Sequence, residues 1–295
     1  MQWRGLEQLI AARTGKAFKV ERDSSVGGGC INSAYKITGQ DRREYFVKFN
    51  NADRLAMFEA EADGLRELSN AQAVLVPEAI ATGIEDSQAY IVMEYLPFGG
   101  GDKGAMRHFG GQLAQLHRSG KDQFGWHRDN TIGATHQPNH WEQDWHSFWC
   151  KHRLGYQLQL AERNGYSQRA LAKAEKVLEQ LDNFFTEYSP PASLLHGDLW
   201  GGNYAVSFTG EPVIFDPAVY YGDREADLAM TELFGGFSAD FYAAYNEAWP
   251  LDAGYKVRKT LYNLYHVLNH FNMFGGGYGQ QAEGMMDRLL GELGH

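Results

Sequence analysis

Two aspartates and an asparagine near the middle of the chain have the spacing of a phosphoryl-transfer site. Asp198 and Asn203 lie in the segment His-Gly-Asp-Leu-Trp-Gly-Gly-Asn, residues 196–203, and Asp216 follows after a short apolar stretch. Phosphoryl transfer needs one carboxylate beside the attacking hydroxyl and oxygen ligands for the metal ion that bridges the phosphates. We therefore predict Asp198 as the catalytic base, and Asn203 and Asp216 as ligands of Mg²⁺, which prefers hard oxygen ligands.

The residues around this segment predict the elements that must position it. Three short strands are predicted, at residues 193–195, 204–208 and 212–215. The first strand would run into the glycine-rich loop, and the other two would form a hairpin that returns Asp216 to the side of Asn203. The alternative is that Asp198 only closes a turn and that Asp216 only caps a helix.

The N-terminal third of the chain carries two features that suit a nucleotide. Gly27, Gly28 and Gly29 lie between two predicted strands, where backbone amides could approach phosphates without side-chain obstruction. A simple hairpin turn is the alternative interpretation of this triplet. Lys48 lies in the apolar strand 44–49, where an unpaired ammonium would be costly to bury. It therefore needs a partner, unless it lies on an edge strand and faces water.

A glutamate on the next predicted element is the candidate partner of Lys48. This element is a helix over residues 53–69, with Asp53 as its N-cap. Glu61 has the helical spacing of the apolar stripe that begins at Met57, so its side chain should point inward. A pair of Lys48 and Glu61 would position nucleotide phosphates, whereas the alternative is a solvated charge beside the stripe.

The pattern of elements divides the chain into two parts. Strands and one helix fill residues 1–97, mainly helices fill residues 98–295, and a glycine-containing link joins the parts. The predicted fold class is α+β, with a small β-rich N-lobe that binds the nucleotide and a larger α-helical C-lobe. Met93, Glu94 and Tyr95 end the last strand before the link, where adenine would bind to backbone groups. The other strands are expected at residues 17–25, 31–38, 79–84 and 89–96, and the helices at 106–117, 141–164, 168–187, 223–234, 239–249, 255–274 and 283–293.

The composition excludes several kinds of partner. The chain has 295 residues, 43% of them hydrophobic, and a net charge of -10. No run of Lys and Arg forms a nucleic-acid footprint, and no apolar run reaches membrane-spanning length. We therefore expect no nucleic-acid partner and no membrane partner. Two cysteines, Cys30 and Cys150, do not make a disulfide framework, so a cytoplasmic location is expected.

The order of these features resembles the kinase fold of small-molecule phosphotransferases, such as aminoglycoside and choline kinases. The resemblance is closer still to one family, the fructosamine or ketosamine 3-kinases, and it spans nearly the whole chain. The segments that carry it are residues 57–61, 92–94, 139–141, 144–145, 153–154, 194–203, 214–222, 230–237 and 262–275. No long activation segment is recognisable after Asp216, which is followed by Pro217 and Ala218 as in the ketosamine kinases.

This resemblance implies the ATP-dependent phosphorylation of the sugar C3 hydroxyl of a ketoamine, a sugar joined to an amine by the Amadori rearrangement. The family's 3-phosphates are unstable and release the amine, which amounts to deglycation. The resemblance also places Trp200 against the sugar or its amine substituent, and His270 and Asn272 on a long helix beside the acceptor pocket. Trp200 could instead be a core aromatic, and His270 a satisfied core histidine. Asp227 is expected to hold the catalytic loop by accepting backbone hydrogen bonds.

Several alternatives stay open at this point. The chain could be another small-molecule kinase that acts on an aminoglycoside, choline or a hydroxylated amino compound, or a non-enzymatic nucleotide-binding scaffold. A metal site could also form among His136, His140, His146, Cys150 and His152, although their spacing fits no closed zinc pattern. The chain is expected to be a monomer or, if Cys30 is reactive beside the phosphate-binding amides, a redox-sensitive homodimer linked through Cys30.

Overall fold

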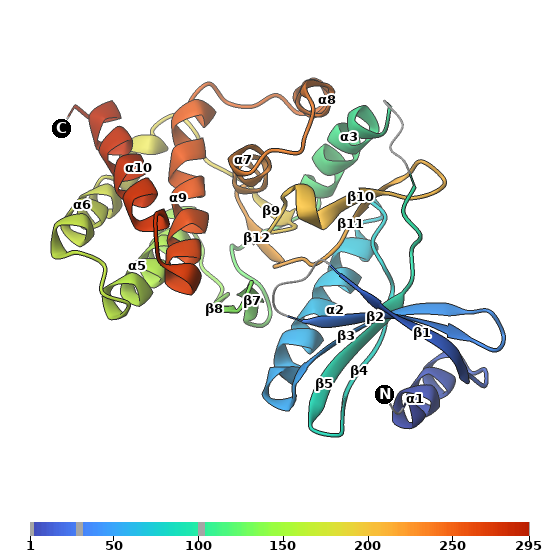
Figure 1. The fold of residues 1–295 in the computed structure, drawn as a ribbon. Coiled ribbons are helices and arrows are strands. Elements are labelled where there is room, and N and C mark those ends of the chain that lie inside the picture. The colour runs from blue at the N-terminus through green and yellow to red at the C-terminus, as the bar shows by residue number, and fades with distance from the viewer. Residues whose placement is uncertain (1–2, 28–31, 100–103, 295) are drawn as a thin grey trace.

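The N-terminal part of the molecule is built on one five-stranded antiparallel sheet. The computed structural model describes residues 3–27, 32–99 and 104–294. The sheet has the strand order β1-β2-β3-β5-β4 (Figure 1). Its strands are β1 (Val20–Val26), β2 (Ser33–Gly39), β3 (Glu44–Asn51), β4 (Ala79–Glu85) and β5 (Gln88–Glu94). The five strands predicted in this part are confirmed, with small shifts at their ends, whereas the division between residues 97 and 98 stays a prediction.

Each face of this sheet packs against a different helix. The helix α1 (Arg4–Thr14) shares a buried cluster with Val92, whereas α2 (Leu55–Asn70) shares the other cluster with Ile91. The two residues belong to opposite clusters because successive side chains of a strand point to opposite faces. The helix that carries Glu61 is thus fixed on the face of the sheet that adjoins the C-terminal part (Figure 1).

The start of α2 differs from the prediction. A short 3-10 turn, η1 (Ala52–Arg54), precedes the helix, and Asp53 lies inside this turn. Arg54 occupies the N-cap position without a side-chain cap bond, so the predicted N-cap at Asp53 is wrong. The turn follows β3 directly. Its first residue, Ala52, donates a backbone hydrogen bond to Ser87 O (3.1 Å) in the β4–β5 connection.

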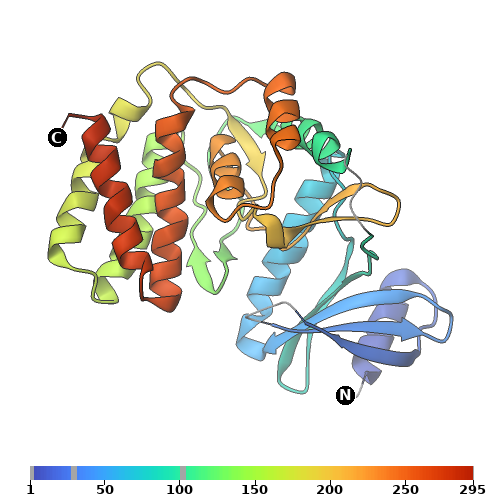
Figure 2. The same ribbon diagram turned by 45° about the horizontal axis from the view of Figure 1, so that its top comes forward.

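The C-terminal part is mainly helical, and its described residues, 104–294, form three small sheets between the helices. The helices are α3 (Ala105–His117), α4 (Trp145–Phe148), η2 (Trp149–Arg153), α5 (Leu154–Arg163), α6 (Gln168–Glu179), η3 (Leu181–Phe184), η4 (Gly201–Asn203), α7 (Glu225–Leu233), α8 (Ala239–Ala248), α9 (Tyr255–Phe274) and α10 (Tyr278–Glu292). The short strands are β6 (Gly120–Lys121), β7 (Asn130–Ile132), β8 (Thr135–Gln137), β9 (Ala192–Leu195), β10 (Tyr204–Val206), β11 (Pro212–Ile214) and β12 (Tyr220–Gly222). Figure 2 shows α5, α6, α9 and α10 side by side, away from the five-stranded sheet.

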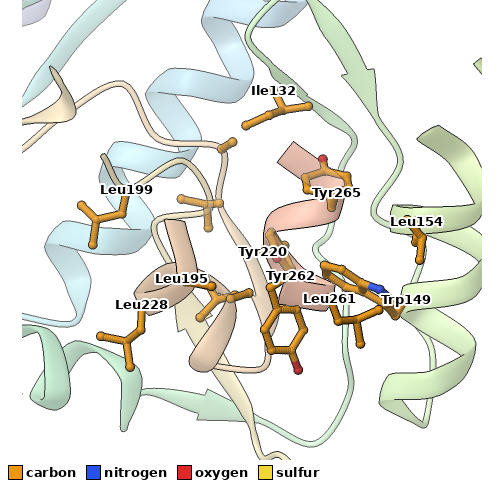
Figure 3. Packing of buried hydrophobic residues seen from close by; sticks show 14 of the residues in the cluster. Ile132, Trp149, Leu154, Leu195, Leu199, Tyr220, Leu228, Leu261, Tyr262 and Tyr265 are labelled. Carbon is orange, nitrogen blue, oxygen red and sulfur yellow. The ribbon is translucent and has the colours of Figure 1, made fainter. Parts of the chain in front are cut away.

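The helix α9 has the predicted bounds and crosses the middle of the C-terminal part. All its residues from Leu261 to Asn269 are buried, so this stretch contacts protein on every side. Leu195 and Leu199, which flank the loop that carries Asp198, belong to the same buried cluster as Leu261, and Figure 3 shows the three side chains within it. The loop is therefore anchored in the main core on both sides. No helix among the described residues has the length and apolarity that a bilayer crossing requires.

The helix predicted over residues 141–164 is wrong in its first half. It begins only at Trp145, where the Asp144 side chain caps Ser147 N (2.8 Å), and it is interrupted by the π-helical turn η2. The turn ends at Arg153, whose buried guanidinium lies 3.9 Å from the ring centre of Tyr220. Seating this cation in the core is a tertiary contact that helical periodicity does not reveal. Two other helices differ from their predicted bounds at one end. The helix predicted over 168–187 ends at Glu179 (α6), and the helix predicted over 283–293 begins at Tyr278 (α10).

Candidate active site

The loop that carries Asp198 leaves β9 at Leu195 and turns sharply at Gly197. Gly197 has a φ of 83°, a left-handed conformation that glycine adopts without strain. A Cβ at this position would lie 2.0 Å from the carbonyl oxygen of Ala218. The carbonyl oxygen of His196 accepts a hydrogen bond from Ala218 N (2.8 Å). The loop thus packs backbone to backbone against the segment that follows Asp216.

Asp227 on α7 holds this loop, as predicted. Its carboxylate accepts hydrogen bonds from the backbone N–H groups of His196 (2.7 Å) and Gly197 (2.8 Å). The Nε2 atom of His117, on α3, lies 3.2 Å from the same carboxylate. Both side chains are buried, so this contact is sheltered from water. Together they fix the backbone that presents Asp198.

The side chain of Asp198 lies beside Asn203. The amide Nδ2 of Asn203 donates to the carbonyl oxygen of Asp198 (2.9 Å) and to its carboxylate Oδ2 (3.2 Å). Burial raises the pKa of Asp198 to about 7, and the charge of Asp216 acts in the same direction, whereas the hydrogen bond from Asn203 opposes it. A carboxylate with a pKa near neutrality is suited to accept a proton from a substrate hydroxyl.

The β10–β11 hairpin returns Asp216 to Asn203, as predicted. Phe215 N donates to the Asn203 carbonyl (3.1 Å), and Asn203 Nδ2 lies 3.5 Å from the carbonyl oxygen of Asp216. Asp216 has a φ of 56°, which is unusual for a residue with a side chain and is a conformation found at functional sites. No described residue donates a hydrogen bond to Asn203 Oδ1, so this oxygen and the Asp216 carboxylate together fit the donor set of a hard cation.

Lys48 is an interior residue, and the interpretation of a water-facing edge lysine is wrong. Its side chain is only 8% exposed, and β3 is not an edge strand because it lies between β2 and β5. The ammonium lies 2.7 Å from Glu61 Oε1 and also pairs with Asp216. Burial alone would lower the pKa of Lys48, but the two carboxylates raise it above its usual value. Glu61 thus points inward as predicted, and one cation links β3, α2 and the hairpin.

The segment predicted to bind adenine lies where β5 leaves the sheet. Met93 is buried, Glu94 N donates to Glu78 O (2.9 Å), and the ring of Tyr95 lies beneath Lys36 Nζ at 4.0 Å from its centre. Gly27 directly follows β1, and its added Cβ would meet open space. Gly28, Gly29 and Cys30 lie outside the described residues.

Two of the three predicted substrate residues lie on one line of aromatic contacts. Trp200 is 40% exposed, so the core-aromatic interpretation is wrong. The rings of Trp200 and Phe234 are steeply inclined to each other, with their centres 6.4 Å apart. Phe234 in turn contacts the ring of His270 at 5.1 Å. His270 is half-buried, and its Nδ1 lies 2.8 Å from the carbonyl oxygen of His266, so Nδ1 is the donor and, in a neutral ring, Nε2 is the acceptor.

Asn272, the third predicted substrate residue, is engaged elsewhere. Its Nδ2 donates to the backbone oxygen (2.9 Å) and side-chain oxygen (2.8 Å) of Gln157, and its Oδ1 accepts from Asn164 Nδ2 (3.0 Å). These contacts tie the end of α9 to α5 and the residue that follows it. The amide therefore helps to fix the helix that presents His270.

The histidines considered as a metal site do not gather into one. No group of three or more His, Cys, Asp and Glu side chains suited to a metal ion occurs within residues 3–27, 32–99 and 104–294. His146 pairs with Asp182, and His152 Nε2 lies 3.2 Å from Glu142. Burial raises the pKa of the Cys150 thiol to about 11, so this cysteine is a poor nucleophile.

The comparison with known proteins agrees with this geometry. The model of the fructosamine kinase family matches residues 2–292. The chain belongs to the fructosamine kinase family. A probable ketoamine kinase from Synechocystis is 48% identical over 289 residues, covering 98% of this chain and 97% of the relative. A chloroplastic protein-ribulosamine 3-kinase from Arabidopsis thaliana is 43% identical over 280 residues, covering 94% of this chain and 85% of the relative.

Solved structures show the same fold. A protein from Haemophilus somnus, assigned by name as a fructosamine-3-kinase, superimposes with a TM-score of 0.89 at 28% identity, covering 98% of this chain and 97% of its own. An aminoglycoside phosphotransferase in complex with ADP and hygromycin B has a TM-score of 0.64 at 16% identity, and the match covers 97% of this chain and 98% of the phosphotransferase. The second similarity concerns the fold alone and confirms the predicted bilobal, kinase-like class.

Three further residues, to which the sequence alone assigned no role, lie around the candidate site. His117 supports Asp227, and Phe234 joins Trp200 to His270. Phe98, in the link that follows β5, stacks on Phe215 with ring centres 5.4 Å apart. Phe234 lies in the segment 230–237 that carries the family resemblance, whereas His117 and Phe98 had no sequence signal of their own, because their partners are distant along the chain.

Proposed function

We propose that this chain uses ATP to phosphorylate the C3 hydroxyl of the sugar in ketoamines such as fructosamines and ribulosamines. The observation that carries the proposal is the convergence of Asp198, Asn203 and Asp216 at one point of a fructosamine kinase family fold. Two relatives of the family are named as a ketoamine kinase and a protein-ribulosamine 3-kinase. They support a ketoamine as the acceptor.

In the proposed reaction Asp198 orients the C3 hydroxyl and takes its proton while the phosphoryl group moves to the oxygen. Lys48, held by Glu61, pairs with phosphate oxygens of the nucleotide. Asn203 and Asp216 would hold Mg²⁺, which supplies positive charge to the phosphates. The backbone of Gly27 to Gly29 and of Met93 to Tyr95 would bind the phosphates and the adenine.

On the acceptor side, the exposed ring of Trp200 offers an apolar face to the sugar or its amine substituent. His270 Nε2, which is an acceptor because Nδ1 donates to His266 O, would bond a sugar hydroxyl. Asn272 would act through the position of α9, since its amide is bonded to Gln157 and Asn164. The phosphorylated ketoamine would then release its amine, which makes the reaction a deglycation in the cytoplasm.

The experiment that tests this function measures ADP release from the purified protein with ATP and Mg²⁺. Four acceptors are compared, namely ribulose-lysine, fructose-lysine, choline and an aminoglycoside. Turnover with either ketoamine that exceeds turnover with the other two supports the proposal, and Asp198→Asn serves as the inactive control. Preference for choline or the aminoglycoside would assign the chain to the alternative, a small-molecule kinase of the kind that its more distant structural neighbours represent.

A further inference from the structure

The β7–β8 hairpin of the C-terminal part contacts the helix that carries Glu61. Arg128, just before β7, pairs with Asp63 (Nη1 to Oδ2, 2.5 Å) and approaches Glu59 (Nη2 to Oε2, 3.5 Å). These two carboxylates lie one turn apart on α2, whereas Glu61 between them points the other way, to Lys48. The contact therefore acts on the turn of α2 that presents Glu61.

The base of this contact is rigid. The carbonyl oxygen of Arg128 accepts a hydrogen bond from Asn139 Nδ2 (3.1 Å), and Asn139 Oδ1 accepts one from Arg153 (2.6 Å). Asn139 and Arg153 are fully buried. The guanidinium of Arg128 thus extends from a fixed point of the C-terminal core, and its side chain is only 28% exposed.

The same hairpin is anchored to the segment that follows Asp216. Asn130 Nδ2 donates to the carbonyl oxygen of Val219 (2.8 Å), and Gln137 Nε2 donates to that of Ala218 (3.2 Å). Both amides are buried, so breaking these bonds would leave polar groups without water. One hairpin therefore connects the helix of Glu61 to the segment of the proposed metal ligand.

Other contacts also join α2 to the C-terminal part, and His127 Nε2 lies 3.9 Å from the same Asp63 carboxylate. Glu67 accepts a hydrogen bond from the hydroxyl of Tyr221 (2.6 Å), and Gly64 packs against Val219, which an added Cβ would meet at 3.2 Å. These contacts keep the two parts together when Arg128 is removed. Arg128 differs from these contacts because its guanidinium pairs with the carboxylates on both sides of Glu61, those of Glu59 and Asp63.

We propose that Arg128 is a positioning residue for nucleotide binding, which locks this turn of α2 against the C-terminal part and so holds Glu61 on Lys48. The inference rests on the proposed role of the Lys48–Glu61 pair in placing the phosphates. Arg128 lies on the far side of α2 from Lys48 and acts through the helix, not through the substrate. A partly exposed ion pair adds little to overall stability, so its removal should alter the site more than the fold.

The test compares Arg128→Gln with wild type by steady-state kinetics and nucleotide titration. We expect KM for ATP to rise about three- to tenfold, within the range of coupling seen for contacting residues. KM for the ketoamine should change little, and Tm should stay within about 3 °C of wild type. Arg128→Lys, which keeps the charge, should recover part of the loss.

Arg66→Gln is the matched control. Arg66 also pairs with Asp63, but it lies on α2 itself and its side chain is 62% exposed, so its loss removes the same charge without freeing the helix. Wild-type KM for ATP in Arg66→Gln supports the proposal. Equal losses in Arg66→Gln and Arg128→Gln would overturn it, because the effect would then be one of charge alone.

A double variant separates this inference from the function on which it rests. If Arg128 acts through Glu61, Arg128→Gln should add no further loss in the Glu61→Gln background. A full additional loss there would overturn the proposal. Wild-type nucleotide kinetics in Glu61→Gln would refute the role assigned to the Lys48–Glu61 pair, whereas an impaired Glu61→Gln together with a normal Arg128→Gln would refute the role of Arg128 only.

Discussion

Lys48 and Asp216 form an ion pair that joins the five-stranded sheet to the segment behind the β10–β11 hairpin. The carboxylate proposed to hold Mg²⁺ is therefore already neutralised by the ammonium proposed to bind phosphate. When a nucleotide binds, both groups need new partners, and a complex of ATP with a divalent cation supplies the two together.

Replacing Asp216 with Ala should remove metal-dependent nucleotide binding and activity together. The variant lacks one of the two oxygen ligands, and it also removes a partner of Lys48. ATP binding is titrated with Mg²⁺ and with chelator, for wild type and variant. Full wild-type activity in chelator, with metal-free ATP, would contradict the assignment of Asn203 and Asp216 as ligands.

Replacing Asp198 with Asn should lower kcat by about 10²–10⁴-fold, the usual contribution of a general base. Nucleotide affinity should stay close to wild type, because no part in holding ATP is assigned to this carboxylate. Single-turnover assays and ATP titration measure the two quantities separately. Retention of more than about a tenth of the wild-type turnover would be incompatible with the role of a base.

Trp200→Ala and His270→Ala should raise KM for the ketoamine, or lower kcat/KM, with little change in KM for ATP. Each change removes contacts to one substrate only. Phe208→Ala is a suitable control, since Phe208 is the most exposed of the large hydrophobic residues and lies in the β10–β11 turn. Equal losses for both substrates would point to a folding defect instead of an acceptor site.

Gly197→Ala should destabilise the protein more than Gly210→Ala. Both glycines have positive φ values, 83° and 85°, so each substitution should cost about 1–2 kcal/mol for the backbone conformation. At Gly210 the added Cβ meets nothing within 4 Å, whereas at Gly197 it lies 2.0 Å from Ala218 O. Urea unfolding measures the difference, and equal losses would show that the loop can shift without cost.

Protonation of His266 should contribute to acid unfolding. Burial, followed by the nearby His270, lowers the pKa of His266 from 6.5 to about 3. The unfolded chain therefore binds more protons between these values, so stability is complete above pH 6.5 and falls as the pH is lowered. The loss from this residue at pH 5 is about 2 kcal/mol.

His266→Phe tests this origin of the acid sensitivity. The free energy of unfolding is measured at pH 7 and pH 5 for both proteins, and the drop between the two pH values should be smaller in the variant by about 2 kcal/mol. The other titrating groups are common to both proteins and cancel in the comparison. An identical drop in the two proteins would show that His266 does not titrate on unfolding in this range.

The parts of the site that could be predicted from the sequence are those whose signal is local. Asp198 and Asn203 lie in one short segment, and the periodicity around Glu61 indicated which way its side chain points. Arg128 gave no such signal, because its proposed role depends on the ion pair with Asp63, a residue far away in the sequence. The π-helical turn before Arg153 was equally invisible, since it serves a contact with Tyr220 and not a local preference.

The segment between Asp216 and α7 is short, and the buried amides of Asn130 and Gln137 hold its backbone. Its hydroxyl-bearing residues, Tyr220 and Tyr221, are 3% and 5% exposed, so a protein kinase acting on this chain would find no accessible acceptor in it. The loop ordering by phosphorylation that activates many protein kinases therefore has no counterpart in this segment. Turnover at the site should then follow the supply of its two substrates, without control through this segment.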